Sequence, residues 1–151
     1  RHLAPPLAPG AAPPAGGCLL TDPIFSRRLR DLFAHHGDNN FRDFELLKYG
    51  RHFRISDESK VIVGRNNADN EALKRLVLSD DLIFNMAKFP GPLVLVPYGK
   101  ESDENIAAAL CVRYSDAPDD MEADIICQQQ KNSKTIKALA ASKEDCETWM
   151  I

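Results

Sequence analysis

Basic side chains that can contact phosphate gather in one short stretch of the sequence. The set is Lys48, Arg51, His52, Arg54, Lys60 and Arg65. A strand over RHFRI (51–55) would place alternate side chains on opposite faces, so Phe53 and Ile55 would face one way. His52 and Arg54 would then face the other way, and Lys60 begins the partner strand. The spacing predicts a hairpin with an apolar inner face and a cationic outer face that can follow a line of phosphates.

A solvated sheet face is the alternative interpretation of this stretch. Acidic residues that could balance its charge lie nearby, namely Asp43, Glu45, Asp57 and Glu58. Tyr49 is the only aromatic candidate near the basic set for stacking on a base. The acidic residues between Glu101 and Asp124 are opposed within that span only by Arg113. This asymmetry of charge along the chain favours a domain that binds a polyanion in one orientation.

Cys18 is the second candidate for chemistry. It follows Gly16 and Gly17 and precedes a helix start, whose positive end can lower the pKa of a thiol. The alternative is an incidental cysteine that packs against Leu19 and Leu20. Cys111, Cys127 and Cys146 lie in apolar patterns and are expected to be small buried residues.

Other catalytic and metal-binding patterns are missing from the sequence. His35 and His36 lack Cys or carboxylate partners at a useful spacing, so we expect no metal site. The segment VGRNNADN (63–70) could hold an anion at a helix start, or it could be a turn in which Asn66 or Asn67 caps the helix. No phosphate-binding GxxxxGK[ST] loop is present. We therefore expect no turnover and no cofactor in this chain alone.

The composition is that of a globular protein rather than a membrane protein. The chain has 151 residues and a formal net charge of −3, so any basic surface must be local. Four scattered cysteines without a CxxC pair argue against zinc and disulfides and favour the cytoplasm. The longest apolar run, Leu93 to Val96, is too short to span a membrane.

The elements that position these residues follow from periodicity and caps. Residues 1–17, rich in Ala and Pro, are expected to be a flexible arm. TDPIFSRRLRDLFAHHG (21–37) predicts a helix capped by Asp22, with Pro23 in its first turn. FELLKYG (44–50) predicts a short second helix that ends at Gly50.

Three hairpin–helix units are predicted for the rest of the chain. The strands are expected at 51–55, 60–64, 82–86, 93–97, 122–128 and 134–139. The helices are expected at about 67–78, at about 102–114 and after Ser142, where Ser142 and Asp145 match the capping-box spacing. This order predicts a single α+β domain with a mostly antiparallel sheet.

The same segments resemble the NFACT-R RNA-binding domain. The stretch VGRNNADNEALKRLVLSDDLIFNMAKFPGPLVLVP (63–97), followed by ENIAAALCVRYSDAP (104–118) and two strands, carries the resemblance. It covers roughly residues 50–140, within an expected domain at 50–151. NFACT-R domains recur in ribosome-associated quality-control proteins that recruit tRNA. Those proteins carry two histidines where this chain has Asn85 and Leu93, which points to a different branch.

The junction and helical segment at 18–49 carry a second resemblance. AGGCLLTDPIFSRRLRDLF (15–33) is similar to the segment that joins this domain to bacterial tRNA thiouridine synthase-like proteins. In that family an upstream ATP-pyrophosphatase domain uses ATP and Mg²⁺ to activate a uridine of tRNA for sulfur transfer. The pyrophosphatase fingerprint is absent here, so the chain is similar to the C-terminal piece of such a transferase.

The resemblance implies a tRNA-binding accessory domain of a tRNA thiolation protein, and the basic set from Lys48 to Arg65 would contact the RNA. Two alternatives stay open. Cys18 could handle sulfur for the parent enzyme, or the chain could be a protein-interaction domain that never touches RNA. The upstream pyrophosphatase domain and tRNA are the expected partners, and no membrane is expected.

Overall fold

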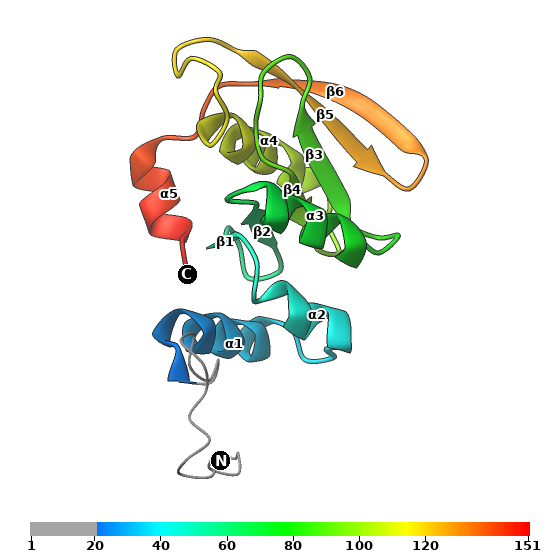
Figure 1. Cartoon of the computed structure of the whole chain (residues 1–151), viewed down its shortest axis with the longest axis vertical. Helices are drawn as coiled ribbons and strands as arrows, with labels where there is room; N and C mark the ends of the chain where they lie inside the picture. The colour runs from blue at the N-terminus through cyan, green and yellow to red at the C-terminus, as the bar shows by residue number, and fades with distance from the viewer. Residues whose placement is uncertain (1–20) are drawn as a thin grey trace.

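A computed structural model describes residues 21–151 of the chain (Figure 1). The helices of this part are α1 (Pro23–His35), α2 (Phe41–Leu46), α3 (Asn67–Leu76), α4 (Glu104–Arg113) and α5 (Lys143–Trp149), with a 3₁₀ turn at Glu101–Asp103. The strands are β1 (Arg51–Arg54), β2 (Lys60–Val63), β3 (Leu82–Met86), β4 (Val94–Val96), β5 (Ala123–Gln129) and β6 (Asn132–Ala138).

Within residues 21–151 the six strands form one sheet in the order β1-β2-β4-β3-β5-β6, and every neighbouring pair is antiparallel. The pairs β1–β2, β3–β4 and β5–β6 are hairpins, and a helix follows each one. This arrangement confirms the predicted α+β class and its three hairpin–helix units.

Side-chain caps fix where the helices begin. The side chains of Asp22, Asn40, Asn66 and Ser142 each accept a backbone N–H from the first turn that follows. The predicted caps at Asp22 and Ser142 are therefore confirmed. Helix α3 ends at Leu76, two residues before its predicted end, because Val77 already has extended backbone angles.

The larger hydrophobic core lies between one face of the sheet and α4. Phe53, Val61, Val63, Phe84 and Ile125 face this side, and they pack with the buried residues of α4. The alanines of α4 let the helix approach the strands closely. Cys111, Cys127 and Cys146 lie in this core, as predicted, and burial raises the pKa of the Cys111 thiol to about 12.

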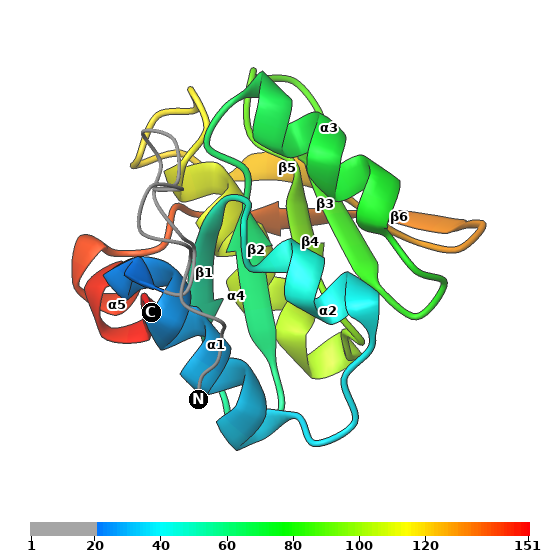
Figure 2. The ribbon, with the colours of Figure 1, turned by 60° about the horizontal axis from the view of Figure 1, so that its bottom comes forward.

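Helices α1, α2 and α3 cover part of the opposite face (Figure 2). Leu46 from α2 and Leu73 from α3 pack there against Ile62 and Leu95 of the sheet. Both faces of the β1–β2 hairpin are consequently covered by helices. No helix within residues 21–151 has the length and apolar character needed to cross a membrane.

The two edges of the sheet differ. The edge at β1 is joined by the end of the chain, because Met150 pairs with Phe53 and the Ile151 N–H donates to the His52 carbonyl at 3.0 Å. The other edge is β6, whose residues are mostly exposed. Among the described residues no further strand pairs with the outer side of β6.

Candidate nucleic-acid interface

An arginine stacked on a tyrosine marks one end of the β1–β2 hairpin. The guanidinium carbon of Arg51 lies 4.7 Å from the centre of the Tyr114 ring. Arg51 is the first residue of β1, and Tyr114 directly follows the last turn of α4. The cation–π contact holds the guanidinium over the ring, while its N–H groups can still donate hydrogen bonds to phosphate.

A hollow of about 320 Å³ adjoins this pair. Its lining is mostly polar and comes from the end of β2, the start of α3 and the loop between β3 and β4. The lining residues are Arg51, Gly64, Arg65, Asn66, Asn67, Asn70, Gly91, Pro92 and Tyr114. Cationic, amide and aromatic groups thus meet around one depression.

Asp69 holds Arg65 in place at the edge of the hollow. The buried carboxylate of Asp69 accepts hydrogen bonds from Nε of Arg65 at 2.8 Å, from the Arg65 backbone N–H and from the Gly50 N–H. Hydrogen bonding to Asp69 raises the pKa of the Arg65 guanidinium. The Arg65 side chain is still 46% exposed, so it remains available to a ligand.

Gly64 lets the hollow keep its shape. A Cβ atom at this position would lie 1.9 Å from the side-chain oxygen of Asn70. That oxygen accepts the Leu93 N–H, and the Gly64 N–H donates to the Leu93 carbonyl. The glycine therefore allows Asn70 to connect the start of α3 to the β3–β4 loop.

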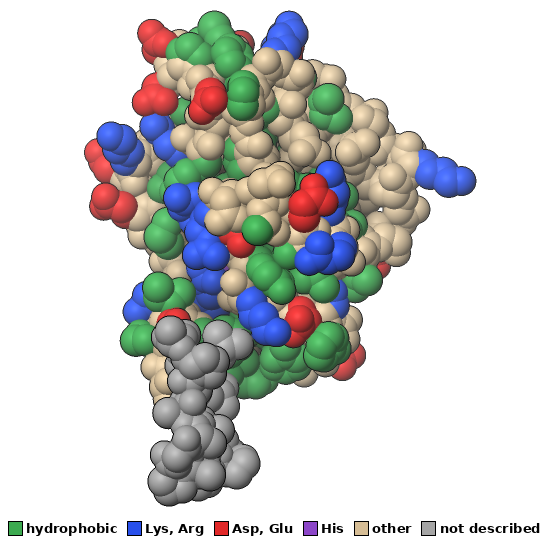
Figure 3. Space-filling model, viewed as in Figure 1, with side chains coloured by type: hydrophobic (Ala, Val, Ile, Leu, Met, Phe, Trp, Pro, Cys, Tyr) green, Lys and Arg blue, Asp and Glu red, His purple; other side chains and the backbone are tan. Residues whose placement is uncertain are grey.

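A second hollow, of about 460 Å³, lies on the other side of Arg51. Arg27 and Arg28 of α1 line it, together with residues at the end of α5. Arg27 is exposed, whereas Arg28 is buried and donates to the carbonyls of Leu47 and Gly50 at 2.9 and 2.8 Å. Figure 3 shows Lys and Arg side chains gathered in a column above α1. We call Arg27, Arg51 and Arg65 the arginine face.

Comparison with known proteins identifies the family. Residues 50–150 match the family model described as the NFACT protein RNA binding domain. The chain belongs to this family. The C-terminal part of a fibronectin/fibrinogen-binding protein from Streptococcus suis has a similar fold, with a TM-score of 0.60 and 12% identity. That match covers 85% of this chain and 67% of the other. No curated protein matches the chain.

Two of the predicted RNA-binding residues of this NFACT RNA-binding domain lie side by side. Arg51 and Arg65 line the same hollow. Lys48 is exposed just beyond α2 and pairs with Glu45 at 2.7 Å. Arg54 lies at the far end of β1, where its Nε donates to Asp31 of α1 at 3.1 Å. The predicted set is therefore divided between the two ends of the hairpin.

The predicted exposure of His52 and Lys60 is wrong. His52 is fully buried, and Lys60 is only 7% exposed. The alternation of faces is correct, because Phe53 packs in the core on the α4 side. The opposite face carries His52 and Lys60, but α1 and α2 cover it, so it is not a cationic outer surface. His52 instead contacts the carbonyls of Leu46 and Tyr49 through Nε2.

Arg27 of the arginine face and Tyr114 beside it were not selected from the sequence. Tyr114, not Tyr49, is the aromatic residue beside Arg51, and Tyr49 packs against the smaller core. Tyr114 is distant from Arg51 in the sequence, so only the fold brings them together. A basic surface that includes Arg27 could have been inferred from the three arginines of the first predicted helix, Arg27, Arg28 and Arg30.

The predictions for segment 63–70, for the acidic span, for Cys18 and for metal binding remain to be compared with the structure. In the segment 63–70, Asn66 caps α3 as one of the two interpretations predicts, because its side chain accepts the Asp69 N–H. Anion binding at this helix start stays a prediction. The acidic span is also less uniform than its sequence suggests, since Lys134 pairs with Glu104, and Lys88 and Lys137 pair with Asp124. Cys18 lies outside the described residues. Within residues 21–151, no group of His, Cys, Asp and Glu could hold a metal ion.

Proposed function

We propose that this chain binds RNA through the arginine face. The observation that carries the proposal is the convergence of Arg51 and Arg65 on one polar hollow, with Arg27 beside the adjoining hollow. Membership in the NFACT RNA-binding domain family supports it. There are two alternatives: RNA binds at another surface of this chain, or the chain binds no RNA.

The chemistry of this surface suits a sugar–phosphate backbone. Guanidinium groups bind phosphate oxygens through paired N–H donors, and their charge releases counterions from the RNA. The exposed side chains of Asn66 and Asn67 add amide donors and acceptors beside the phosphates. Tyr114, already stacked under Arg51, extends the flat surface on which an unpaired base can lie.

RNA binding by a charge-reduced variant tests the site. The test variant replaces Arg27, Arg51 and Arg65 with Gln. The control variant replaces Lys131, Lys134 and Lys137 on the β5–β6 hairpin with Gln, which removes the same charge from a different surface. Fluorescence anisotropy with labelled tRNA at several salt concentrations measures both affinity and its salt dependence.

We expect the test variant to bind tRNA at least tenfold more weakly, because three phosphate contacts are lost. Its log–log salt slope should fall by roughly 0.7–0.9 for each contact. The control variant should keep nearly wild-type affinity and slope. Equal weakening of both variants would show a non-specific charge effect, and undiminished binding by the test variant would place the RNA elsewhere.

We further propose tRNA as the RNA and a bacterial tRNA thiolation protein as the parent. The similarity of residues 15–33 to the junction in thiouridine synthase-like proteins supports this context. In that arrangement the domain delivers tRNA to an upstream ATP-pyrophosphatase domain that uses ATP and Mg²⁺. The comparison experiment measures thiouridine in tRNA by mass spectrometry, with the parent carrying either a native or a mutated arginine face. Unchanged thiouridine would argue against this parent and leave the RNA-binding test unaffected.

A further inference from the structure

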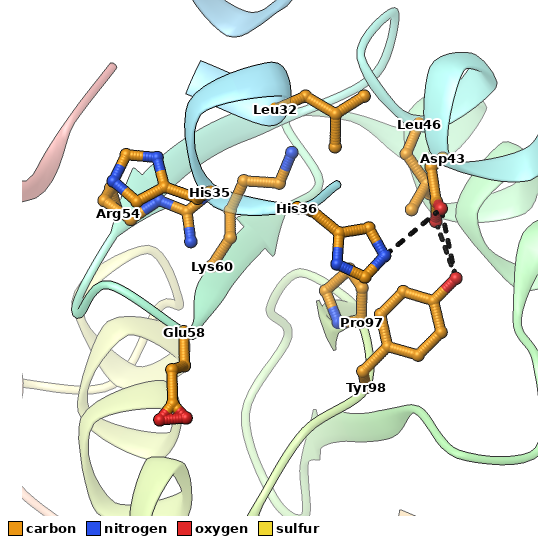
Figure 4. A pocket seen from close by; sticks show the side chains of 10 residues that line it. All are labelled: Leu32, His35, His36, Asp43, Leu46, Arg54, Glu58, Lys60, Pro97 and Tyr98. Carbon is orange, nitrogen blue, oxygen red and sulfur yellow. Dashed lines mark hydrogen bonds and ion pairs between the residues drawn. The ribbon is translucent and has the colours of Figure 1, made fainter. Parts of the chain in front are cut away.

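A small cavity lies at the end of the β1–β2 hairpin far from the arginine face. Its volume is about 40 Å³, it opens to solvent, and it is lined by the end of α1, by α2, by the hairpin and by the segment after β4 (Figure 4). The wall is apolar at Leu32, Leu46 and Pro97. We call it the Lys60 cavity, after the amine that reaches it from β2.

Lys60 enters this cavity without a partner. The residue is 7% exposed, and within residues 21–151 its Nζ forms no hydrogen bond or ion pair, although this atom is not completely shielded from water. A nearly buried ammonium has lost most of its hydration, and a hydrogen bond to a bound anion would replace part of that loss. An unpaired and nearly buried ammonium beside an open space is therefore a candidate group for binding an anion.

The acidic groups around the cavity are already engaged. Asp31 binds Arg54 and His35. Asp43 accepts hydrogen bonds from the Tyr98 hydroxyl and from the Asn40 N–H, and it also faces His36 at 3.8 Å.

Glu58, the remaining acidic residue of the lining, forms an ion pair with Lys100. Each carboxylate near the cavity thus has its own cation or donor. Lys60 is the group whose charge no neighbouring residue contacts directly.

We propose that the Lys60 cavity binds one small monocarboxylate of about the size of acetate. The carboxylate would accept hydrogen bonds from the Lys60 ammonium, and the alkyl end would lie against Leu32, Leu46 and Pro97. A volume of about 40 Å³ corresponds to about three water molecules, which matches the size of formate or acetate. The apolar wall distinguishes a carboxylate with a methyl group from a fully hydrated inorganic anion.

The charges around Lys60 set how this binding depends on pH. Burial, and then the positive charges of Arg54 and Arg28, lower the pKa of Lys60 to about 8, whereas Asp31 and Asp43 oppose that shift. Buried His52 faces the same amine from β1. Carboxylate binding requires the ammonium form, so acetate affinity should decline as the pH rises through about 8.

Titration with sodium acetate tests the site, with sodium chloride at equal ionic strength as the reference. The readouts are the melting temperature and the ¹H–¹⁵N amide shifts of the whole chain. Acetate should raise the melting temperature in a saturable manner and shift amide signals around the cavity, whereas chloride should not. The variant Lys60→Met keeps the length of the side chain and removes its charge, so its acetate dissociation constant should rise at least tenfold.

Lys88→Met is the matched control, because Lys88 is an exposed lysine on the β3–β4 loop that pairs with Asp124. It should bind acetate as the wild type does. The wild-type pH series is a second measurement that needs no variant to fold. No saturable acetate effect, an equal effect of chloride, or equal affinity in Lys60→Met would each overturn the proposal.

Discussion

Basic side chains are buried beside one another where α1 crosses the β1–β2 hairpin. Arg28 donates to two carbonyls, but its Nε has no partner, and Nδ1 of buried His52 also has none among the described residues. Burial lowers the pKa of His52 well below its usual value, so the imidazole is neutral and donates through Nε2. The folded state therefore tolerates little further charge at this position.

The variant Lys60→Met should be more stable than the wild type near neutral pH. The folded-state pKa of about 8 lies below the ordinary 10.5, so protonated Lys60 costs about 3 kcal/mol of folding free energy below pH 8. Between about pH 8 and 10.5 the unfolded chain holds a proton that the folded chain has lost. Wild-type stability should rise with pH across that range relative to the variant. Urea unfolding of both proteins in acetate-free buffer measures the difference, and a gap that does not change with pH would contradict this assignment.

The sequence predicted on which face of the hairpin each of these residues lies, but not whether that face is exposed to water. Alternation along 51–55 correctly separated Phe53 from His52. Whether the second face of a hairpin meets water depends on elements elsewhere in the chain, here α1 and α2. Arg54 and Lys60 therefore resembled surface cations in the sequence, although Arg54 binds Asp31 and Lys60 is nearly buried beside a small cavity.

At the scale of elements, Arg42 joins three parts of the fold. From α2 it donates to the Leu76 carbonyl at the end of α3 and to the carboxylate of Asp81 ahead of β3. Its guanidinium also lies 5.1 Å from the centre of the Tyr98 ring, beyond β4. Asp81 is almost completely buried and also accepts the N–H groups of Leu78 and Tyr98.

Replacement of Asp81 with Ala should destabilise the fold by about 3 kcal/mol, because buried Arg42 loses a carboxylate partner and two N–H groups lose their acceptor. The neighbouring variant Asp80→Ala is the control, since the Asp80 side chain is exposed. Chemical denaturation measures both, and the control should change by less than about 0.5 kcal/mol. Similar losses in the two variants would show that the Arg42–Asp81 contact contributes little.

Elements whose signals are local were predictable from the sequence. The caps at Asp22 and Ser142 and the three hairpins are encoded by neighbouring residues, and they lie where expected. The position of α1 against the sheet is not encoded locally. The apolar residues Ile24 and Phe33 of α1 are 48% and 59% exposed, whereas Arg28 and Leu32 are the residues of α1 that become buried.

At the scale of the whole molecule, a net charge of −3 coexists with a local arginine face. Three arginine contacts predict a log–log salt slope for tRNA of about −2 to −3, because each phosphate contact contributes 0.7–0.9. The surrounding negative charge should also slow association without changing where RNA binds. Anisotropy titrations across salt concentrations measure the slope. A much steeper slope would require basic contacts well beyond the arginine face.

The pairing of Met150 and Ile151 with β1 also limits how copies of this chain can associate. Repeated edge-to-edge addition of sheets needs a free strand at both edges of every copy. Here the backbone of the last two residues occupies part of the β1 edge, while β6 offers the other edge with its lysines. Two copies could meet through β6, but such a pair would present no second open edge to a third copy. Growth into a continuous ribbon would first require the C-terminal residues to detach from β1.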